Sequence, residues 1–299
     1  PGRDLRGMVA KCSTCLHGYL HRSWIMSRIA VYQIYYDQAS RAQLQPDFIP
    51  LDNTANERPD WYEFWVILKF LRENELKADT WYAFLSPKFT FKTGFDSKLV
   101  LTVLKDHARH ANVVLLSPFW DQIFYFKNPW EQGEMVHPGI TDLTQQFLSH
   151  IGMDVDLKSL VTDLSSTVYS NFVFAKKEYW TEWKKLAEAF FKYVEEDGHM
   201  DGGMKTSYHS PDKDSPMKTF MQERLASLIL ATQKFEVVTF DRSASAEVNP
   251  YLFQDNYATR KTLSVCDFMK TKYRETADEG YLDMYWKLRS QIAFTPIVM

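Results

Sequence analysis

Carboxylate, amide, imidazole and indole groups lie close together in residues 128–140, NPWEQGEMVHPGI. Glu131 or His137 could act there as a general base toward a hydroxyl group, because both kinds of side chain exchange protons with bound reactants. The Trp130 ring could cover the apolar face of a sugar. The prolines indicate a loop, and a loop that carries only a helix cap is an equally good interpretation.

Two lysines lie in residues 86–94, SPKFTFKTG. The chain has no G-x-G-x-x-G, P-loop, G-x-S-x-G or H-E-x-x-H motif, so the commonest signatures of dinucleotide enzymes, NTPases, serine hydrolases and zinc proteases are missing. Phosphate recognition would then depend on side chains such as Lys88 and Lys92 and on backbone amides. A surface loop with two solvated lysines is the equal alternative.

The elements that must position these groups alternate between short apolar runs and helical patterns. Strands are predicted at 29–36, 81–85, 113–116, 170–175 and 236–240, and helices at 61–71, 97–110, 177–195, 219–232 and 271–294. Residues 196–218 lack an apolar period and indicate a long loop. This alternation predicts an α/β fold with a mostly parallel sheet and helices on both faces.

In such a sheet the ligand site lies beyond the carboxyl ends of the strands, so polar residues in the following loops matter most. Tyr36 follows the first predicted strand, the two lysines follow the second, and Ser117 follows the third. Asp52 and Asn53 could contact the ribose or the base of a nucleotide, or form only an Asx-type turn.

Glu223 lies near the start of the predicted helix that follows the long loop. Its carboxylate could face an acceptor hydroxyl and act as a base. It could instead form an ion pair with Arg224 that orients the loop, and this structural interpretation is favoured.

Composition excludes several classes of protein. The formal charge is −3 without a sustained basic run, which argues against a nucleic-acid partner. No stretch approaches the roughly 20 apolar residues of a membrane-spanning helix, and three cysteines indicate a reducing compartment.

Basic residues interleave with aromatic residues near the C-terminus, which is compatible with peripheral membrane contact, although a solvated helix face is the commoner meaning. These are Lys270, Lys272, Arg274, Lys287 and Arg289.

Residues 1–25 have no clear apolar period, and we expect a poorly ordered upstream extension with Met26 as the natural start. Cys12, Cys15, His17 and His21 could ligate zinc, but their spacing leaves no room for the usual zinc finger. We expect the main α/β domain at 26–245 and a helical extension at 246–299.

The order of several short motifs resembles a family of bacterial capsule and lipopolysaccharide glycosyltransferases. Asp52-Asn53-Thr54 followed by Glu63 and Trp65 resembles that family's DNTG-type turn and E-L-T-x-x-Y-W helix. Residues 81–89, 169–175 and 220–225 resemble its later motifs, with SPKF in place of the HYRR-type motif. The resemblance spans roughly residues 29–235.

The resemblance implies a GT-A-like fold and a cytoplasmic enzyme, and it is compatible with a place at the inner face of the membrane. The donor would be a UDP- or GDP-linked sugar, and the acceptor a polysaccharide or a lipid-linked oligosaccharide. The implied donor-binding residues are Tyr36, Asp52, Asn53, Lys88, Lys92 and Ser117, the acceptor-binding residues Trp130 and Asn171, and the catalytic candidates Glu223, His137 and Glu131.

Many GT-A enzymes hold a divalent metal through a D-x-D motif at the end of a central strand. That position reads Ser117-Pro118-Phe119 here. The D-x-D sequence at 154–156 lies near a predicted helix start or turn, where we expect its carboxylates to cap the backbone and face solvent. A divalent metal therefore lacks support, and cations or helix N-termini would stabilise the leaving group. A non-catalytic carbohydrate-binding or scaffold protein of the same pathway is the alternative.

Overall fold

A computed structural model describes residues 28–196, 205–207 and 214–296. The central strands are β1 (Arg28–Tyr35), β2 (Ile49–Asp52), β3 (Thr80–Leu85), β4 (Val113–Leu115), β5 (Val173–Ala175) and β8 (Val237–Thr239), and a separate antiparallel pair is formed by β6 (Lys205–Ser207) and β7 (Asp214–Pro216). The helices are α1 (Gln38–Arg41), α2 (Tyr62–Glu73), α3 (Phe89–Thr93), α4 (Ser97–His107), α5 (Trp120–Tyr125), α6 (Pro129–Val136), α7 (Ile140–His150), α8 (Lys177–Glu195), α9 (Met217–Gln222), α10 (Leu225–Thr232), α11 (Tyr257–Thr276) and α12 (Glu279–Arg289).

The main sheet of the described chain has six strands in the order β2-β1-β3-β5-β4-β8. β1 runs parallel to β2 and β3, and β4 runs parallel to β8, whereas β5 is antiparallel to both of its neighbours. The predicted α/β class with a mostly parallel sheet is therefore confirmed. The start of β5 lies at the same edge of the sheet as the carboxyl ends of β3 and β4, because its direction is reversed.

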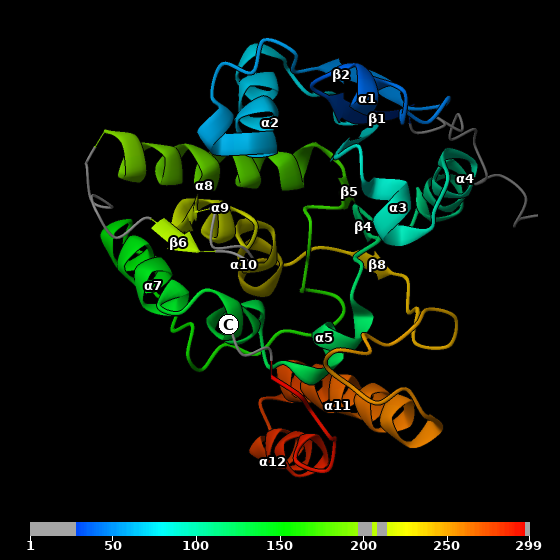
Figure 1. Cartoon of the computed structure of the whole chain (residues 1–299), viewed down its shortest axis with the longest axis vertical. Helices are drawn as coiled ribbons and strands as arrows, with labels where there is room; N and C mark the ends of the chain where they lie inside the picture. Colours follow the sequence, from blue (N-terminus) through cyan, green and yellow to red (C-terminus); the bar gives the residue numbers. More distant parts are fainter. Residues whose placement is uncertain (1–27, 197–204, 208–213, 297–299) are drawn as a thin grey trace, which may run out of the picture.

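Alternating side chains of the strands pack into two hydrophobic cores, one on each face of the sheet. Tyr82 and Phe84 of β3 pack with α2 and α8, while Trp81, Ala83 and Leu85 pack with α3 and α4. The cartoon shows these helices on opposite sides of the strands (Figure 1). Helices on both faces were predicted and are confirmed.

The apolar stripe of α8 explains why this helix forms and how it is placed. Trp180, Trp183 and Phe190 recur at helical spacing and are buried against the sheet and α2. Trp180 Nε1 donates a hydrogen bond to the Tyr82 carbonyl oxygen at 3.1 Å, which joins the helix to β3. The predicted helix at 177–195 is confirmed, and its aromatic residues are core residues.

The C-terminal helices pack against α5 through a third hydrophobic core. Leu263, Cys266 and Tyr285 are fully buried there with Phe124 of α5. Lys270 is also fully buried, and its Nζ donates to the Ile123 and Phe126 carbonyl oxygens.

Three of the basic residues considered for membrane contact take part in contacts within the protein. Besides Lys270, Arg274 pairs with Asp163, and Arg289 pairs with Glu131. Lys272 pairs with Glu275, and the side chains of Lys272, Arg274, Lys287 and Arg289 are all partly exposed. No described helix is long and apolar enough to cross a lipid bilayer.

Two sequence predictions of local structure are wrong, and two elements were not predicted. Residues 129–136 form α6 rather than a loop, because the Asn128 side chain caps the helix by accepting from the backbone N–H of Trp130 and of Glu131. The helix predicted at 219–232 is two helices, α9 and α10, which meet at Glu223 and Arg224. The short strand β2 and most of α11 were not predicted. The predictions for residues 1–25 and for the middle of the long loop lie outside the described residues.

Candidate functional site

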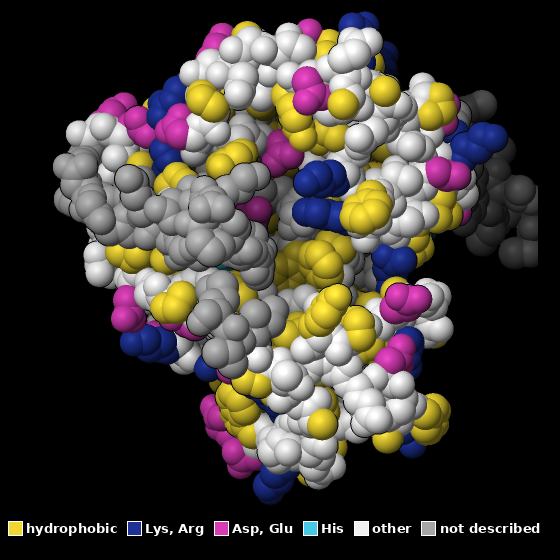
Figure 2. All heavy atoms as spheres, viewed as in Figure 1, with side chains coloured by type: hydrophobic (Ala, Val, Ile, Leu, Met, Phe, Trp, Pro, Cys, Tyr) yellow, Lys and Arg dark blue, Asp and Glu magenta, His cyan; other side chains and the backbone are white. Residues whose placement is uncertain are grey.

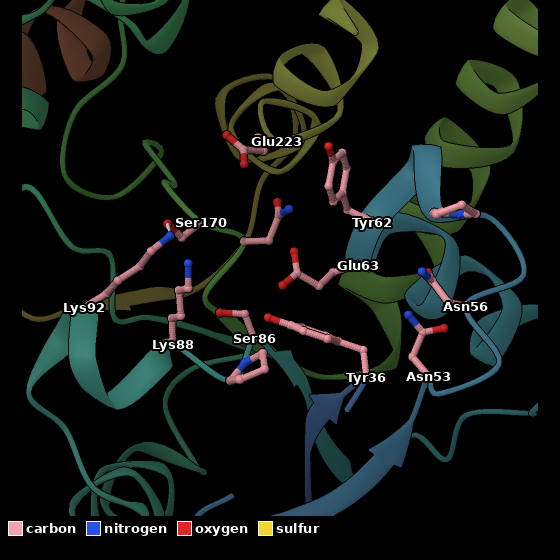
Figure 3. A pocket seen from close by; sticks show the side chains of 13 residues that line it. Tyr36, Asn53, Asn56, Tyr62, Glu63, Ser86, Lys88, Lys92, Ser170 and Glu223 are labelled. Atoms are coloured by element: carbon pink, nitrogen blue, oxygen red, sulfur yellow. Dashed lines mark hydrogen bonds between the residues drawn. The ribbon is translucent and has the colours of Figure 1, made fainter. Parts of the chain in front are cut away.

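A pocket of about 650 Å³ opens at the carboxyl ends of β1, β2 and β3 and at the start of β5. Basic side chains border this hollow on one side and acidic side chains on the other (Figure 2). The lining residues come from segments far apart in the chain, and the close-up shows them converging on one space (Figure 3). They are Tyr36, Asn53, Asn56, Pro59, Tyr62, Glu63, Ser86, Pro87, Lys88, Lys92, Ser170, Asn171 and Glu223.

The basic wall is the short helix α3, which follows β3. Lys88 occupies the N-cap position, where its side chain makes no capping hydrogen bond, and Lys92 lies in the last turn. Both lysines project from the same side of the helix (Figure 3). Gly94 ends the helix at φ 71°, a backbone conformation that favours glycine. Lys92 Nζ donates to Ser170 Oγ at 2.9 Å, while Lys88 forms no ion pair with any described residue.

The acidic wall consists of Glu63, in the first turn of α2, and Glu223, at the junction of α9 and α10. Burial raises the pKa of both carboxyls above the usual range, and the nearby Lys92 acts against this rise. Neither carboxylate forms an ion pair within the described part of the chain. Two proton-accepting groups thus face two cations across one pocket (Figure 3).

Backbone strain concentrates around this pocket. Asn56 (φ 41°), Tyr62 (φ 48°), Ser170 (φ 62°) and Asn171 (φ 56°) are four of the six non-glycine residues with positive φ in the described chain, and all four line it. Such conformations are costly for residues other than glycine, and they persist where the surrounding structure imposes them, often at functional sites.

Asn171 also presents an unsatisfied polar atom. Its Oδ1 is buried and has no hydrogen-bond partner among the described residues. A buried acceptor without a partner is costly unless a ligand or water completes it. The Asn171 side chain is therefore suited to accept a hydrogen bond from a bound molecule.

Six of the site residues predicted from sequence line this pocket, namely Tyr36, Asn53, Lys88, Lys92, Asn171 and Glu223. Asp52 and Ser117 do not. Asp52 accepts from Tyr35 Oη at 2.7 Å and from the Thr54 backbone N–H at 2.8 Å, which is the Asx-type turn that was the alternative interpretation. Ser117 is buried and donates to the Thr167 carbonyl oxygen at 3.2 Å.

The three candidates of the segment 128–140 are also placed elsewhere. Trp130 is 1% exposed and belongs to the hydrophobic core, so its ring offers no sugar-binding face. Glu131 accepts from Arg289 at 2.7 Å and from the Lys127 backbone N–H, which ties α6 to α12. His137 is 3% exposed and stacks on Phe220 with 3.4 Å between ring centres. None of the three lines the pocket.

Sequence reasoning did not include Asn56, Tyr62, Glu63 and Ser170 among the site residues. Glu63 stands next to the buried stripe of α2, where a solvated carboxylate is the default expectation. The signal that could have included it is the motif order, in which Glu63 and Trp65 resemble the E-L-T-x-x-Y-W helix. The positive φ angles of the other three have no sequence signature apart from the preference of asparagine for such conformations.

The described residues contain no group of three or more histidine, cysteine, aspartate or glutamate side chains arranged to hold a metal ion. In the D-x-D at 154–156, Asp156 accepts from the Lys158 backbone N–H at 3.0 Å, which is a local turn contact.

No known protein family, curated protein or solved structure matches this chain.

Proposed function

We propose that this protein is a glycosyltransferase, which moves a sugar from a UDP- or GDP-linked donor to a glycan or lipid-linked acceptor. The observation that carries the proposal is that Lys88 and Lys92 face Glu63 and Glu223 across one pocket at the carboxyl edge of the sheet. A GT-A-like arrangement of the sheet, with activity at the cytoplasmic face of a membrane, is part of the same proposal.

The two lysines suit the diphosphate of the donor. Ammonium groups bind phosphate oxygens as point charges, and charge-assisted hydrogen bonds are roughly twice as strong as neutral ones. When the bond from the sugar to the diphosphate breaks, the electron pair stays with the phosphate oxygen. Cations that already face this oxygen stabilise the charge as it develops, without reorganisation.

The carboxylates suit the acceptor. The attacking hydroxyl oxygen forms the new bond to the sugar, and its proton passes to a carboxylate, for which we propose Glu223. The amides of Asn53, Asn56 and Asn171 and the ring of Tyr36 supply the neutral hydrogen-bonding and stacking surface that sugars and nucleosides need.

Thermal-shift measurements with UDP, GDP, CMP and their sugar derivatives test the proposal. At least one diphosphate should stabilise the protein, and Lys88→Ala and Lys92→Ala should reduce the shift. Lys98→Ala, which removes an exposed lysine of α4 outside the pocket, is the matched control. Stabilisation by glycans without any nucleotide effect would instead favour the non-catalytic carbohydrate-binding protein.

A further inference from the structure

The backbone of Tyr62 has φ 48° and ψ −136°, a conformation that only glycine adopts freely. Tyr62 separates the short 3-10 helix Pro59–Trp61 from the rest of α2. The nearby Trp61 and Phe64 are buried, and their rings stack with 4.9 Å between centres. Trp61 Nε1 also donates to Glu195 at 2.9 Å. These fixed neighbours impose the strained backbone, which keeps the Tyr62 side chain outside the core.

The phenol ring of Tyr62 is an accessible aromatic surface of the pocket. The residue is 47% exposed and lines the pocket. Its side chain makes no hydrogen bond and no ring contact with another residue that the structure describes. Aromatic rings offer a large apolar face, which can pack against the apolar face of a sugar. A half-exposed ring that is held at a cost in backbone strain is therefore suited to bind a ligand.

Tyr62 lies close to the proposed base, Glu223. Gln222 Nε2 donates to the Trp61 carbonyl oxygen at 3.4 Å, and Glu223 and Tyr62 are the residues that follow these two in the chain. The ring and the carboxylate stand at the same end of the pocket (Figure 3). A ligand that covers the ring can therefore reach the carboxylate.

The other phenol that lines the pocket within the described residues, Tyr36, lies toward the basic wall. Tyr36 follows β1, and Gln33 of β1 donates through Nε2 to the Ser86 carbonyl oxygen at 3.5 Å. The close-up shows Tyr36 beside Ser86 and Lys88 (Figure 3). One ring of the pocket thus lies on the side of the lysines, and the other lies on the side of the proposed base.

The polar groups around Tyr62 suit a neutral ligand that carries hydroxyl groups. The carboxylates of Glu63 and Glu223 are hydrogen-bond acceptors, as is the buried Asn171 Oδ1, which has no partner among the described residues. Hydroxyl groups supply the donors that these acceptors need, whereas the carboxylates would repel a further phosphate. A sugar ring combines such hydroxyl groups with an apolar face.

We infer that Tyr62 and Glu223 form the acceptor end of the pocket, where the terminal ring of a saccharide stacks on the Tyr62 phenol. A hydroxyl group of this ring faces Glu223. Its oxygen forms the new bond to the donor sugar and its proton passes to the carboxylate, while the diphosphate leaves with the electron pair. This inference deepens the proposed function and depends on it for the role of Glu223. Stacking of a saccharide on Tyr62 does not require the reaction and can be measured by itself.

Saturation-transfer difference NMR on the full chain tests the inference. The probes are the methyl pyranosides of glucose, galactose, mannose and N-acetylglucosamine, each with and without UDP or GDP. At least one probe should bind, and Tyr62→Ala should raise its Kd about tenfold because the stacking face is lost. Tyr62→Phe keeps the ring and should keep the wild-type Kd. Tyr251→Ala is the matched control, since Tyr251 is 79% exposed and lies outside the pocket.

A glycine variant separates binding from folding. Glycine relieves the backbone strain, so Tyr62→Gly should be at least as stable as Tyr62→Ala in urea denaturation and should bind the glycoside just as weakly. If Tyr62→Ala does not fold, Tyr62→Gly takes its place. A merely structural role of the ring would lower the stability of both variants and leave the Kd of the glycoside unchanged.

Two results would overturn the inference, namely no binding of any probe, or a wild-type glycoside Kd in the variants that lack the ring. Weaker UDP or GDP binding in these variants, with unchanged glycoside binding, would place the nucleobase on Tyr62 and would also overturn it. Nucleotide binding without glycoside binding would leave the proposed donor standing. Glycoside binding that depends on Tyr62, without any nucleotide effect, would support the saccharide end of the pocket and reject the transferase.

Discussion

Lys92 Nζ donates a hydrogen bond to Ser170 Oγ at 2.9 Å, which joins α3 to the turn that precedes β5. The bond connects two segments that are 78 residues apart in the chain. One end of it is a cation of the pocket, and the other end is a residue held at φ 62°. The basic wall and the strained turn therefore form one unit, and an anion that binds Lys92 competes with Ser170 for the same ammonium group.

Removal of either lysine should weaken diphosphate binding. A hydrogen bond to a charged group contributes about 1.5–3 kcal/mol, so Lys88→Ala or Lys92→Ala should raise the Kd of UDP or GDP about tenfold or more. Ser170→Ala should have the opposite effect on Kd, because Lys92 no longer has to leave a protein partner. Isothermal titration calorimetry measures all three values. Unchanged affinity in both lysine variants would show that the diphosphate does not bind to this basic wall.

The substitution Asn171→Gly should be tolerated in the folded protein but should weaken ligand binding. Its φ of 56° costs an ordinary residue about 1–2 kcal/mol, so Asn171→Ala should lower the free energy of unfolding by about 1 kcal/mol. Asn171→Gly should be more stable than Asn171→Ala, since glycine adopts this conformation freely. Both variants lose the unsatisfied Oδ1 and should bind ligand more weakly. Urea denaturation and calorimetry give the two quantities, and wild-type affinity in Asn171→Gly would contradict the assigned role.

Asp60 should make stability depend on pH in the acid range. Burial alone would raise its pKa, but Arg58 and Lys218 lower it from 3.8 to about 2. A lowered folded-state pKa stabilises the protein above pH 3.8, and this contribution is lost as the pH falls toward 2. The urea midpoint of Asp60→Asn should lie below that of the wild type at pH 6, and the difference should shrink toward pH 3. A difference that stays constant with pH would show that the effect is not electrostatic.

Lys270 should be essential for the packing of the C-terminal helices. Its buried ammonium group donates to the carbonyl oxygens of Ile123 and Phe126 and lies 3.7 Å from Asp267. Lys270→Met leaves these groups unpaired in the core, which should cost about 3 kcal/mol. Lys272→Met, two residues further along the same helix, should cost less than about 0.5 kcal/mol. Equal effects in urea denaturation would show that the internal bonds contribute little.

Much of the fold could be predicted from local pattern. The stripe of α8 and the apolar runs of β1, β3 and β4 are continuous enough for their period and length to identify them. The four-residue strand β2 was not predicted, and the capped helix α6 was predicted as a loop. β2 alternates poorly and lies at the edge of the sheet, and the helix at 129–136 depends on one capping side chain, Asn128.

The α/β class, the two faces of the sheet and the place of Tyr36 and the two lysines after strands follow from period and chain order, so they can be read from the amino-acid sequence. Which candidate residues share a pocket depends on the folded chain. It placed Glu63 opposite Lys88 and buried Trp130 and His137 in the core. Convergence at a sheet edge depends on strand order and direction, which long-range packing selects and which no local pattern encodes.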